Sequence, residues 1–109
     1  MTELLDRATA ETYASWFRAL ADPSRVQIVE YLARQGRPLS VGEIVTAVGL
    51  AQSTVSQHLK ILTEVRFVLV EAVGNARHYR INTNCVACFP SAADVVMGKP
   101  APSPIGGCA

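Results

Sequence analysis

The chain has 109 residues and a mass of 11.7 kDa, which is enough for one compact domain and little else. Half of its residues are hydrophobic and 17% are charged, a composition that excludes a disordered chain. The formal net charge is only +1, so nucleic-acid binding would have to come from local clusters of basic side chains. At this size, a mean hydropathy of +0.22 indicates apolar surface left over for a partner subunit.

No segment of the sequence carries a signal for export or membrane insertion. Residues 1–6 lack the basic region and apolar core of a signal peptide. No uninterrupted apolar run approaches the roughly 20 residues that cross a bilayer. We therefore expect a soluble, cytoplasmic protein without a membrane partner.

Apolar spacing and helix-end signals predict two helices in the first third of the chain. Apolar residues recur at roughly helical intervals over residues 5–20. A second helix is expected to begin with Asp22 as its N-cap and Pro23 in its first position. Gly36 and Pro38 would end this second helix.

The next segment predicts a helix-turn-helix unit. Ser40 and Glu43 have the spacing of a capping box and would begin a short third helix that ends at Gly49. A fourth helix is predicted over residues 52–64, with apolar residues on one face. Because only residues 49–51 separate these two helices, we expect them to form a helix-turn-helix.

A small β-hairpin is predicted after the helices, with strands at 67–71 and 77–81 around the turn residues Gly74 and Asn75. A last short helix is expected at about residues 92–97. This order is that of a winged helix-turn-helix, mainly α with a small β-hairpin wing. We assign residues 1–97 to that DNA-binding domain and residues 98–109, half of which are Gly or Pro, to a flexible C-terminal tail.

The fourth helix is expected to present short polar side chains to solvent, and such side chains reach base edges in the major groove of DNA. Basic residues of this helix and of the wing, Arg80 among them, would instead hold phosphates. We predict base contacts from Gln52, Ser53, Thr54 and Gln57, with Ser56, His58, Lys60, Asn75 and Arg77 completing the interface. For His58 two roles stay open, a phosphate contact and a hydrogen bond to the turn before the third helix. A solvated helix face is the alternative for the whole set.

Three segments resemble the ArsR/SmtB family of repressors. Residues 20–29 read LADPSRVQIV and resemble the second-helix signature of the family. Residues 52–62 resemble its recognition helix, and residues 77–81 resemble the returning strand of its wing. The resemblance covers residues 5–84 and departs at Arg66, where the family usually has glycine. We therefore expect a left-handed backbone conformation at Arg66.

The resemblance implies a homodimeric, DNA-binding repressor that dimerises through its first and last helices. It also implies that an inducer, often a metal ion, lowers the affinity for operator DNA. A redox enzyme built on a C-x-x-C pair and a protein-interaction module are the competing functions. No Ser-His-Asp set, catalytic carboxylate pair or phosphate-binding glycine loop occurs in the sequence, so we expect no enzyme.

The inducer site is predicted from the cysteines. Residues 40–43 lack the C-x-C pair of the family's arsenite site, and the last helix offers Asp94 but no histidine. Cys85, Cys88 and Cys108 remain, and three thiolates select a soft ion. We predict As(III) or antimony as the inducer and no organic cofactor. Mercury, cadmium or lead, thiol oxidation, and the absence of any sensor role stay as alternatives.

Overall fold

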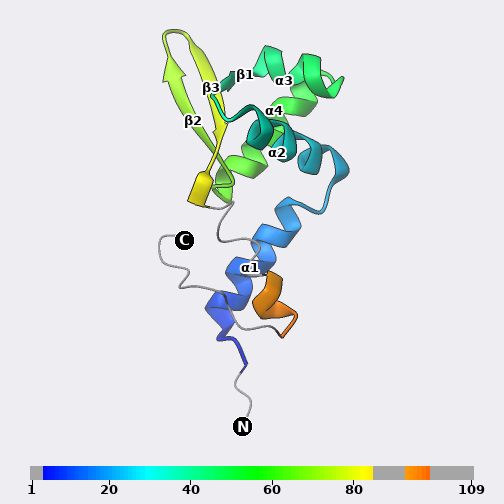
Figure 1. Ribbon diagram of the computed structural model, residues 1–109, viewed down its shortest axis with the longest axis vertical. Helices are drawn as coiled ribbons and strands as arrows, with labels where there is room; N and C mark the ends of the chain where they lie inside the picture. The colour runs from blue at the N-terminus through cyan, green and yellow to red at the C-terminus, as the bar shows by residue number, and fades with distance from the viewer. Residues whose placement is uncertain (1–3, 85–92, 99–109) are drawn as a thin grey trace.

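The computed structural model describes residues 4–84 and 93–98 and contains a helical bundle with a small sheet at one side (Figure 1). The predicted class, mainly α with a small β-hairpin wing, is confirmed. Cys85, Cys88 and Cys108 lie outside the described residues, as does all of the predicted tail after Gly98. The elements in chain order are α1 (Arg7–Ala19), α2 (Pro23–Gln35), β1 (Leu39–Ser40), α3 (Val41–Val48), α4 (Gln52–Glu64), β2 (Val68–Val73) and β3 (Ala76–Ile81).

The first two helices begin at aspartate N-caps. Asp6 accepts a hydrogen bond of 2.8 Å from the Thr9 amide, so α1 starts at Arg7, two residues later than the apolar spacing suggests. Asp22 accepts hydrogen bonds from the amides of Ser24 and Arg25 at 2.8 and 3.2 Å, which confirms the predicted cap of α2. Each cap provides an acceptor for amide groups that have no partner within the helix.

The helix-turn-helix is formed by α3 and α4. The predicted capping box begins α3, because the Glu43 amide donates to Ser40 Oγ at 3.2 Å and the Ser40 amide donates to Glu43 Oε1 at 3.1 Å. Gly49 ends α3 in a left-handed conformation with a φ of 71°. The fourth helix has the predicted bounds, residues 52–64.

The sheet has three antiparallel strands in the order β1-β3-β2. Val73 pairs with Ala76, so Gly74 and Asn75 form the predicted hairpin turn. Strand β1 was not predicted, because two residues are too few to show an alternating pattern. It forms because β3 offers a free edge, on which Leu39 pairs with Tyr79.

Arg66 has the expected positive φ of 64° at the end of α4. The side-chain amide of Asn82 donates to the Arg66 carbonyl at 2.8 Å and stabilises this turn. The next residue, Phe67, is buried and precedes β2 rather than starting it. The turn therefore inserts an aromatic side chain into the core before the wing begins.

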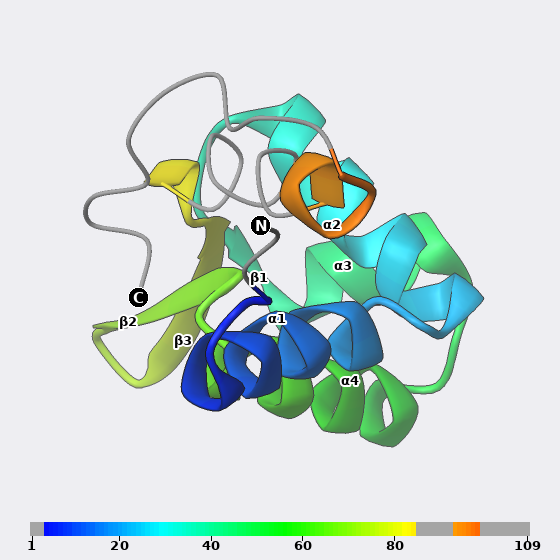
Figure 2. The ribbon, with the colours of Figure 1, turned by 90° about the horizontal axis from the view of Figure 1, so that it is seen from below.

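The core lies between α2, α3, α4 and the sheet, and its fully buried side chains include Ile28, Leu32, Leu39, Ile44, Leu59 and Leu62. Helix α1 contributes Tyr13, Trp16 and Ala19 to this core, while its N-terminal end extends away from it, and the helical turn at residues 93–96 lies beside α1 (Figure 1). Figure 2, seen from that end, places α1 and the turn in front of the other elements. Within residues 4–84 and 93–98, no helix is long and apolar enough to span a membrane.

A candidate nucleic-acid interface

The polar face of α4 points away from the core. Val55, Leu59 and Leu62, spaced four and three residues apart, are buried and hold the helix against its neighbours. The predicted DNA-contacting residues of this helix are exposed apart from His58: Gln52, Ser53, Thr54, Ser56, Gln57 and Lys60. The arrangement leaves a helix face of short hydrogen-bonding side chains accessible to a ligand.

The N-terminus of α4 is open. Its N-cap is Ala51, which makes no side-chain hydrogen bond, and its first turn contains no acidic residue. The first amide groups of a helix lack partners within the helix and carry a partial positive charge. This end of α4 therefore suits an anion such as a backbone phosphate.

The wing and α4 meet at a groove of about 540 Å³. Ser56 and Lys60 of α4 and Asn75 and Arg77 of the wing all line it. The remaining lining residues come from α3, α4 and the sheet: Val41, Thr63, Val70 and Tyr79. The groove therefore brings together four predicted site residues that are up to 21 positions apart in the sequence.

No ion pair within the described residues neutralises the two basic side chains of this groove. In the part of the chain that the structure describes, the ion pairs join Arg7 to Glu11, Arg34 to Glu30, Arg37 to Glu43, and His58 to Asp22. Lys60 and Arg77 belong to none of these pairs and are exposed. Their charges are available to a polyanion.

His58 differs from the other predicted residues, because its side chain is only 14% exposed. Its Nδ1 atom lies 3.2 Å from an Nη atom of Arg25, and its Nε2 atom lies 4.0 Å from Asp22. Of the two roles left open for His58, the hydrogen bond to the turn before α3 is not the one observed, because the ring contacts the start of α2 instead. The amide of Arg25 donates to the Asp22 carboxylate and is the main cause that lowers the pKa of Asp22; the Ser24 amide lowers it further.

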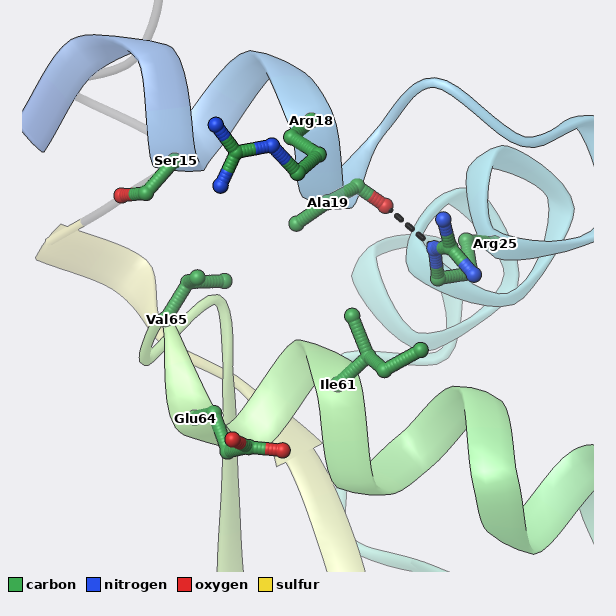
Figure 3. Close-up of a pocket in the computed structure, with 7 residues that line it drawn as sticks. All are labelled: Ser15, Arg18, Ala19, Arg25, Ile61, Glu64 and Val65. Atoms are coloured by element: carbon green, nitrogen blue, oxygen red, sulfur yellow. Dashed lines mark hydrogen bonds between the residues drawn. The ribbon is translucent and has the colours of Figure 1, made fainter. Parts of the chain in front are cut away.

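The sequence reasoning missed Arg25. A single arginine on a helix has no distinctive pattern, although Arg25 belongs to the segment 20–29 that carries the family resemblance. Its Nε atom donates to the carbonyl of Ala19 at 2.5 Å (Figure 3). Arg25 also lines a pocket of about 290 Å³ between the end of α1 and α4, together with Ser15, Arg18, Ala19, Ile61, Glu64 and Val65 (Figure 3).

A second exposed surface is apolar and lies at the opposite end of the molecule from the wing tip (Figure 1). Leu4 is 91% exposed and Met97 is 78% exposed. Between α1 and residues 93–98 is a hollow of about 890 Å³, lined by Leu4, Leu5, Ala10, Tyr13, Ala14, Phe17, Val95, Val96 and Gly98. Such a surface is costly to leave in water and is typical of a protein contact.

The predicted metal site, Cys85, Cys88 and Cys108, lies outside the described residues. Within residues 4–84 and 93–98, no group of three or more histidine, cysteine, aspartate or glutamate side chains is placed to hold a metal ion.

Comparison with known proteins identifies the family. Residues 22–69 match the family described as bacterial regulatory protein, arsR family. The chain is 37% identical over 78 residues to the HTH-type transcriptional regulator Rv2034 of Mycobacterium tuberculosis, a match that covers 72% of this chain and 71% of that one. The chain belongs to the arsR family.

Two further comparisons extend the likeness of this arsR-family protein. It is 33% identical over 87 residues to the probable mercury resistance operon repressor of Streptomyces lividans. That match covers 80% of this chain but only 63% of the length of the repressor. Its fold resembles the solution structure of the homodimeric winged helix-turn-helix DNA-binding domain of Mb0332 from Mycobacterium bovis, with a TM-score of 0.68 and 29% identity. That likeness covers 89% of this chain and 91% of the other. The predicted winged helix-turn-helix is thereby confirmed.

Proposed function

We propose that this arsR-family protein is a homodimeric transcriptional repressor that binds double-stranded operator DNA through α4 and the wing. The observation that carries the proposal is the groove in which Ser56 and Lys60 of α4 meet Asn75 and Arg77 of the wing. A helix in the major groove and a wing on the adjacent backbone need such a common surface. The repressor name of the Streptomyces relative supports the same function.

The proposed contacts divide into two classes. Gln52, Ser53, Thr54 and Gln57 occupy the exposed N-terminal half of α4 and would read base edges. Lys60, Arg77 and the open amide groups at the start of α4 would hold phosphates and set the register of the domain without reading sequence. Ser56 and Asn75 lie between these groups along the groove and complete the interface.

The apolar surface of α1 and residues 93–98 is the proposed dimer interface. Its exposed leucine, valine and methionine side chains would be covered by the same surface of a second copy, as in a two-fold symmetric dimer. The homodimeric state of the Mb0332 domain supports this assignment. A dimer would present two copies of α4 to two half-sites of an operator.

We further propose that As(III) releases the repressor by binding Cys85, Cys88 and Cys108. The donor set supports a thiophilic ion, since all three side chains are thiols. One relative is named as a probable mercury resistance operon repressor, and mercury is another thiophilic ion. Cys85 follows the last residue of β3, Ile81, by four positions, so ligation would act next to the wing. A coupling of about 1–3 kcal/mol would lower DNA affinity about 5–150-fold.

Fluorescence anisotropy tests both parts of the proposal. The reduced protein is titrated onto labelled DNA from upstream of its own gene at fixed salt, since phosphate contacts make affinity depend steeply on salt. We expect specific binding that arsenite reverses. Absence of specific binding would contradict the repressor, and release by mercury, cadmium, lead or an oxidant but not by arsenite would contradict the arsenic assignment.

Cysteine variants locate the site. We expect Cys85→Ser and Cys88→Ser each to bind DNA as the wild type does and to lose release by arsenite. Cys108→Ser is tested in the same way. If this variant also loses release by arsenite, the Cys108 thiol is one of the ligands. Release that survives in both Cys85→Ser and Cys88→Ser would contradict the assigned site.

A further inference from the structure

Arg25 connects three helices, although it lies on α2 and away from the groove of α4 and the wing. Its side chain contacts the last residue of α1, Ala19, and the ring of His58 in α4. Its own amide donates to the N-cap of α2, Asp22. The side chain thus forms a polar bridge between the helix that carries the apolar surface and the helix that carries the proposed DNA contacts.

The first half of the bridge satisfies a helix end. Ala19 is the last residue of α1 and is 2% exposed, so its carbonyl lacks both a helical partner and free access to water. The Nε–H group of Arg25 donates to that carbonyl at 2.5 Å (Figure 3). A positive charge at the C-terminus of a helix is also favourable, so this contact fixes the position of Arg25 against α1.

The second half of the bridge defines the state of His58. A guanidinium group can only donate, so the Nδ1 atom of His58, 3.2 Å from an Nη atom of Arg25, has to be the acceptor. The ring proton then resides on Nε2, which faces the Asp22 carboxylate at 4.0 Å. Because the ring is 14% exposed, few water molecules can compete with Arg25 for its Nδ1 atom.

We propose that Arg25 is a positioning residue for DNA binding, which fixes α4 relative to α1 by joining the Ala19 carbonyl to the His58 ring. This inference rests on the proposed function. His58 directly follows Gln57 and stands two positions before Lys60 in α4, so a shift of its backbone would move the residues that meet DNA. In a dimer formed through α1, the same bridge would also set the separation of the two α4 helices.

The geometry calls for arginine and not only for a positive charge. The planar guanidinium donates in two fixed directions, whereas the ammonium of lysine is a single point on a flexible stem. We therefore expect Arg25→Lys to lose DNA affinity nearly as much as Arg25→Ala does.

A double-mutant cycle measures the bridge. Operator affinity is determined by anisotropy for the wild type, Arg25→Ala, His58→Leu and the double variant, at the same salt. We expect each single change to weaken binding about three- to tenfold, the scale of one hydrogen bond, and the double variant to bind no more weakly than the weaker single one. Losses that multiply would show independent roles and overturn the inference.

A matched pair of variants isolates the acceptor. Asparagine at position 58 places an amide oxygen near the Nδ1 position, whereas leucine has a similar size and shape without an acceptor. We expect His58→Asn to keep most of the wild-type affinity that His58→Leu loses. Equal losses in the two variants would overturn the bridge, and this pair decides the question even if Arg25→Ala does not fold.

A spectroscopic measurement separates positioning from mere stability. The ¹⁵N NMR signals of the wild-type His58 ring are expected to report an unprotonated Nδ1 and a protonated Nε2, and this signature is expected to change in Arg25→Lys while thermal melting shows the variant folded. An unchanged signature would overturn the bridge. A wild type that binds no DNA specifically would instead overturn the proposed function.

Discussion

The end of the molecule formed by α1 and residues 93–98 differs in its surface chemistry from the end formed by α4 and the wing. At the first end, large apolar side chains such as Leu4 and Met97 face solvent. At the second, the exposed side chains are polar, and they include Lys60 and Arg77, which belong to none of the ion pairs within residues 4–84 and 93–98. Both ends belong to one domain with one core, so the burial of that core does not explain why their surfaces differ.

The difference shows which surface is complete in a single copy of the chain. Polar side chains form hydrogen bonds with water until DNA replaces that water. Exposing the surface of α4 and the wing to solvent therefore costs little free energy. Apolar side chains gain free energy only when another surface covers them. In a single copy of the chain, the surface at the wing is therefore well solvated, whereas the apolar surface at α1 needs a partner to cover it. The two ends should respond differently to substitution.

The largest effect is expected where the two ends are joined. Trp16 of α1 is buried, stacks on Tyr13 with ring centroids 5.3 Å apart, and lies 6.4 Å from the ring of Phe67. We expect Trp16→Ala to lower the free energy of unfolding by about 3–5 kcal/mol because it removes this packing. Denaturant unfolding measures the change, and Val26→Ala, at an exposed valine of α2, is the control. Equal losses in the two variants would show that α1 is not anchored through Trp16.

A charge on the apolar surface is expected to separate the dimer. Leu5 and Val96 line the hollow beside α1 and are exposed in the single chain. Leu5→Glu and Val96→Glu should raise the dissociation constant of the dimer at least about tenfold, because a buried unpaired charge costs more than 1.4 kcal/mol. Analytical ultracentrifugation measures the constant. Val26→Glu, at an exposed valine outside the hollow, is the matched control, and its equal effect would remove the assignment of this surface.

Loss of a basic side chain at the opposite end is expected to weaken DNA binding and its salt dependence. Lys60→Ala and Arg77→Ala should each reduce the slope of log affinity against log salt by about 1, the value for one lost phosphate contact. Anisotropy titrations over a range of salt concentrations provide the slope. Arg34→Ala is the control, since Arg34 is exposed on α2 and pairs with Glu30. An unchanged slope in both variants would place the groove away from the phosphates.

The smallest effect is expected in the pH dependence of stability, and it should be similar at the two ends. Hydrogen bonds from Thr9 lower the pKa of Asp6 at the start of α1. The Ser40 amide, and then Arg37, lower the pKa of Glu43 at the start of α3. A carboxylate with a lowered folded-state pKa stabilises the protein above its ordinary pKa, and that contribution is lost as the pH falls through the lowered value.

Melting temperatures measured from about pH 5 to about pH 2 test this. At the upper pH, Asp6→Asn and Glu43→Gln are expected to have lower melting temperatures than the wild type. The difference in melting temperature should shrink as the pH falls, because the wild-type carboxylates become protonated. A difference that stays constant with pH would show that the charge of these caps contributes nothing.

Local chemistry made most of the fold predictable. Asp22 with Pro23, the Ser40–Glu43 capping box and the Gly74–Asn75 turn each depend on a few neighbouring residues, and all three have the predicted structure. Strand β1 was not predictable in this way, since its two residues become a strand only by pairing with β3. Helix α1 also starts two residues later than apolar spacing predicts, because the Asp6 cap determines the helix end more strongly than that spacing does.

The candidate site divides along the same line. Helical periodicity alone indicated that Ser53, Gln57 and Lys60 share a face opposite the buried residues of α4. The role of His58 could not be predicted, because its partner Arg25 stands 33 positions earlier in the chain. A contact over that separation depends on how α2 packs against α4.

The sequence by itself determined the helices and the hairpin in their order, the caps of α2 and α3, the hairpin turn and the polar face of α4, because each of these is encoded by residues within a few positions of one another. Three separate segments of that kind also indicated the family. Only the tertiary structure decided that the wing and α4 share one groove, that β1 joins the sheet, and that Arg25 links Ala19 to His58. Each of these contacts joins segments distant in sequence, and their geometry is fixed only when the buried faces of the helices and the sheet pack together.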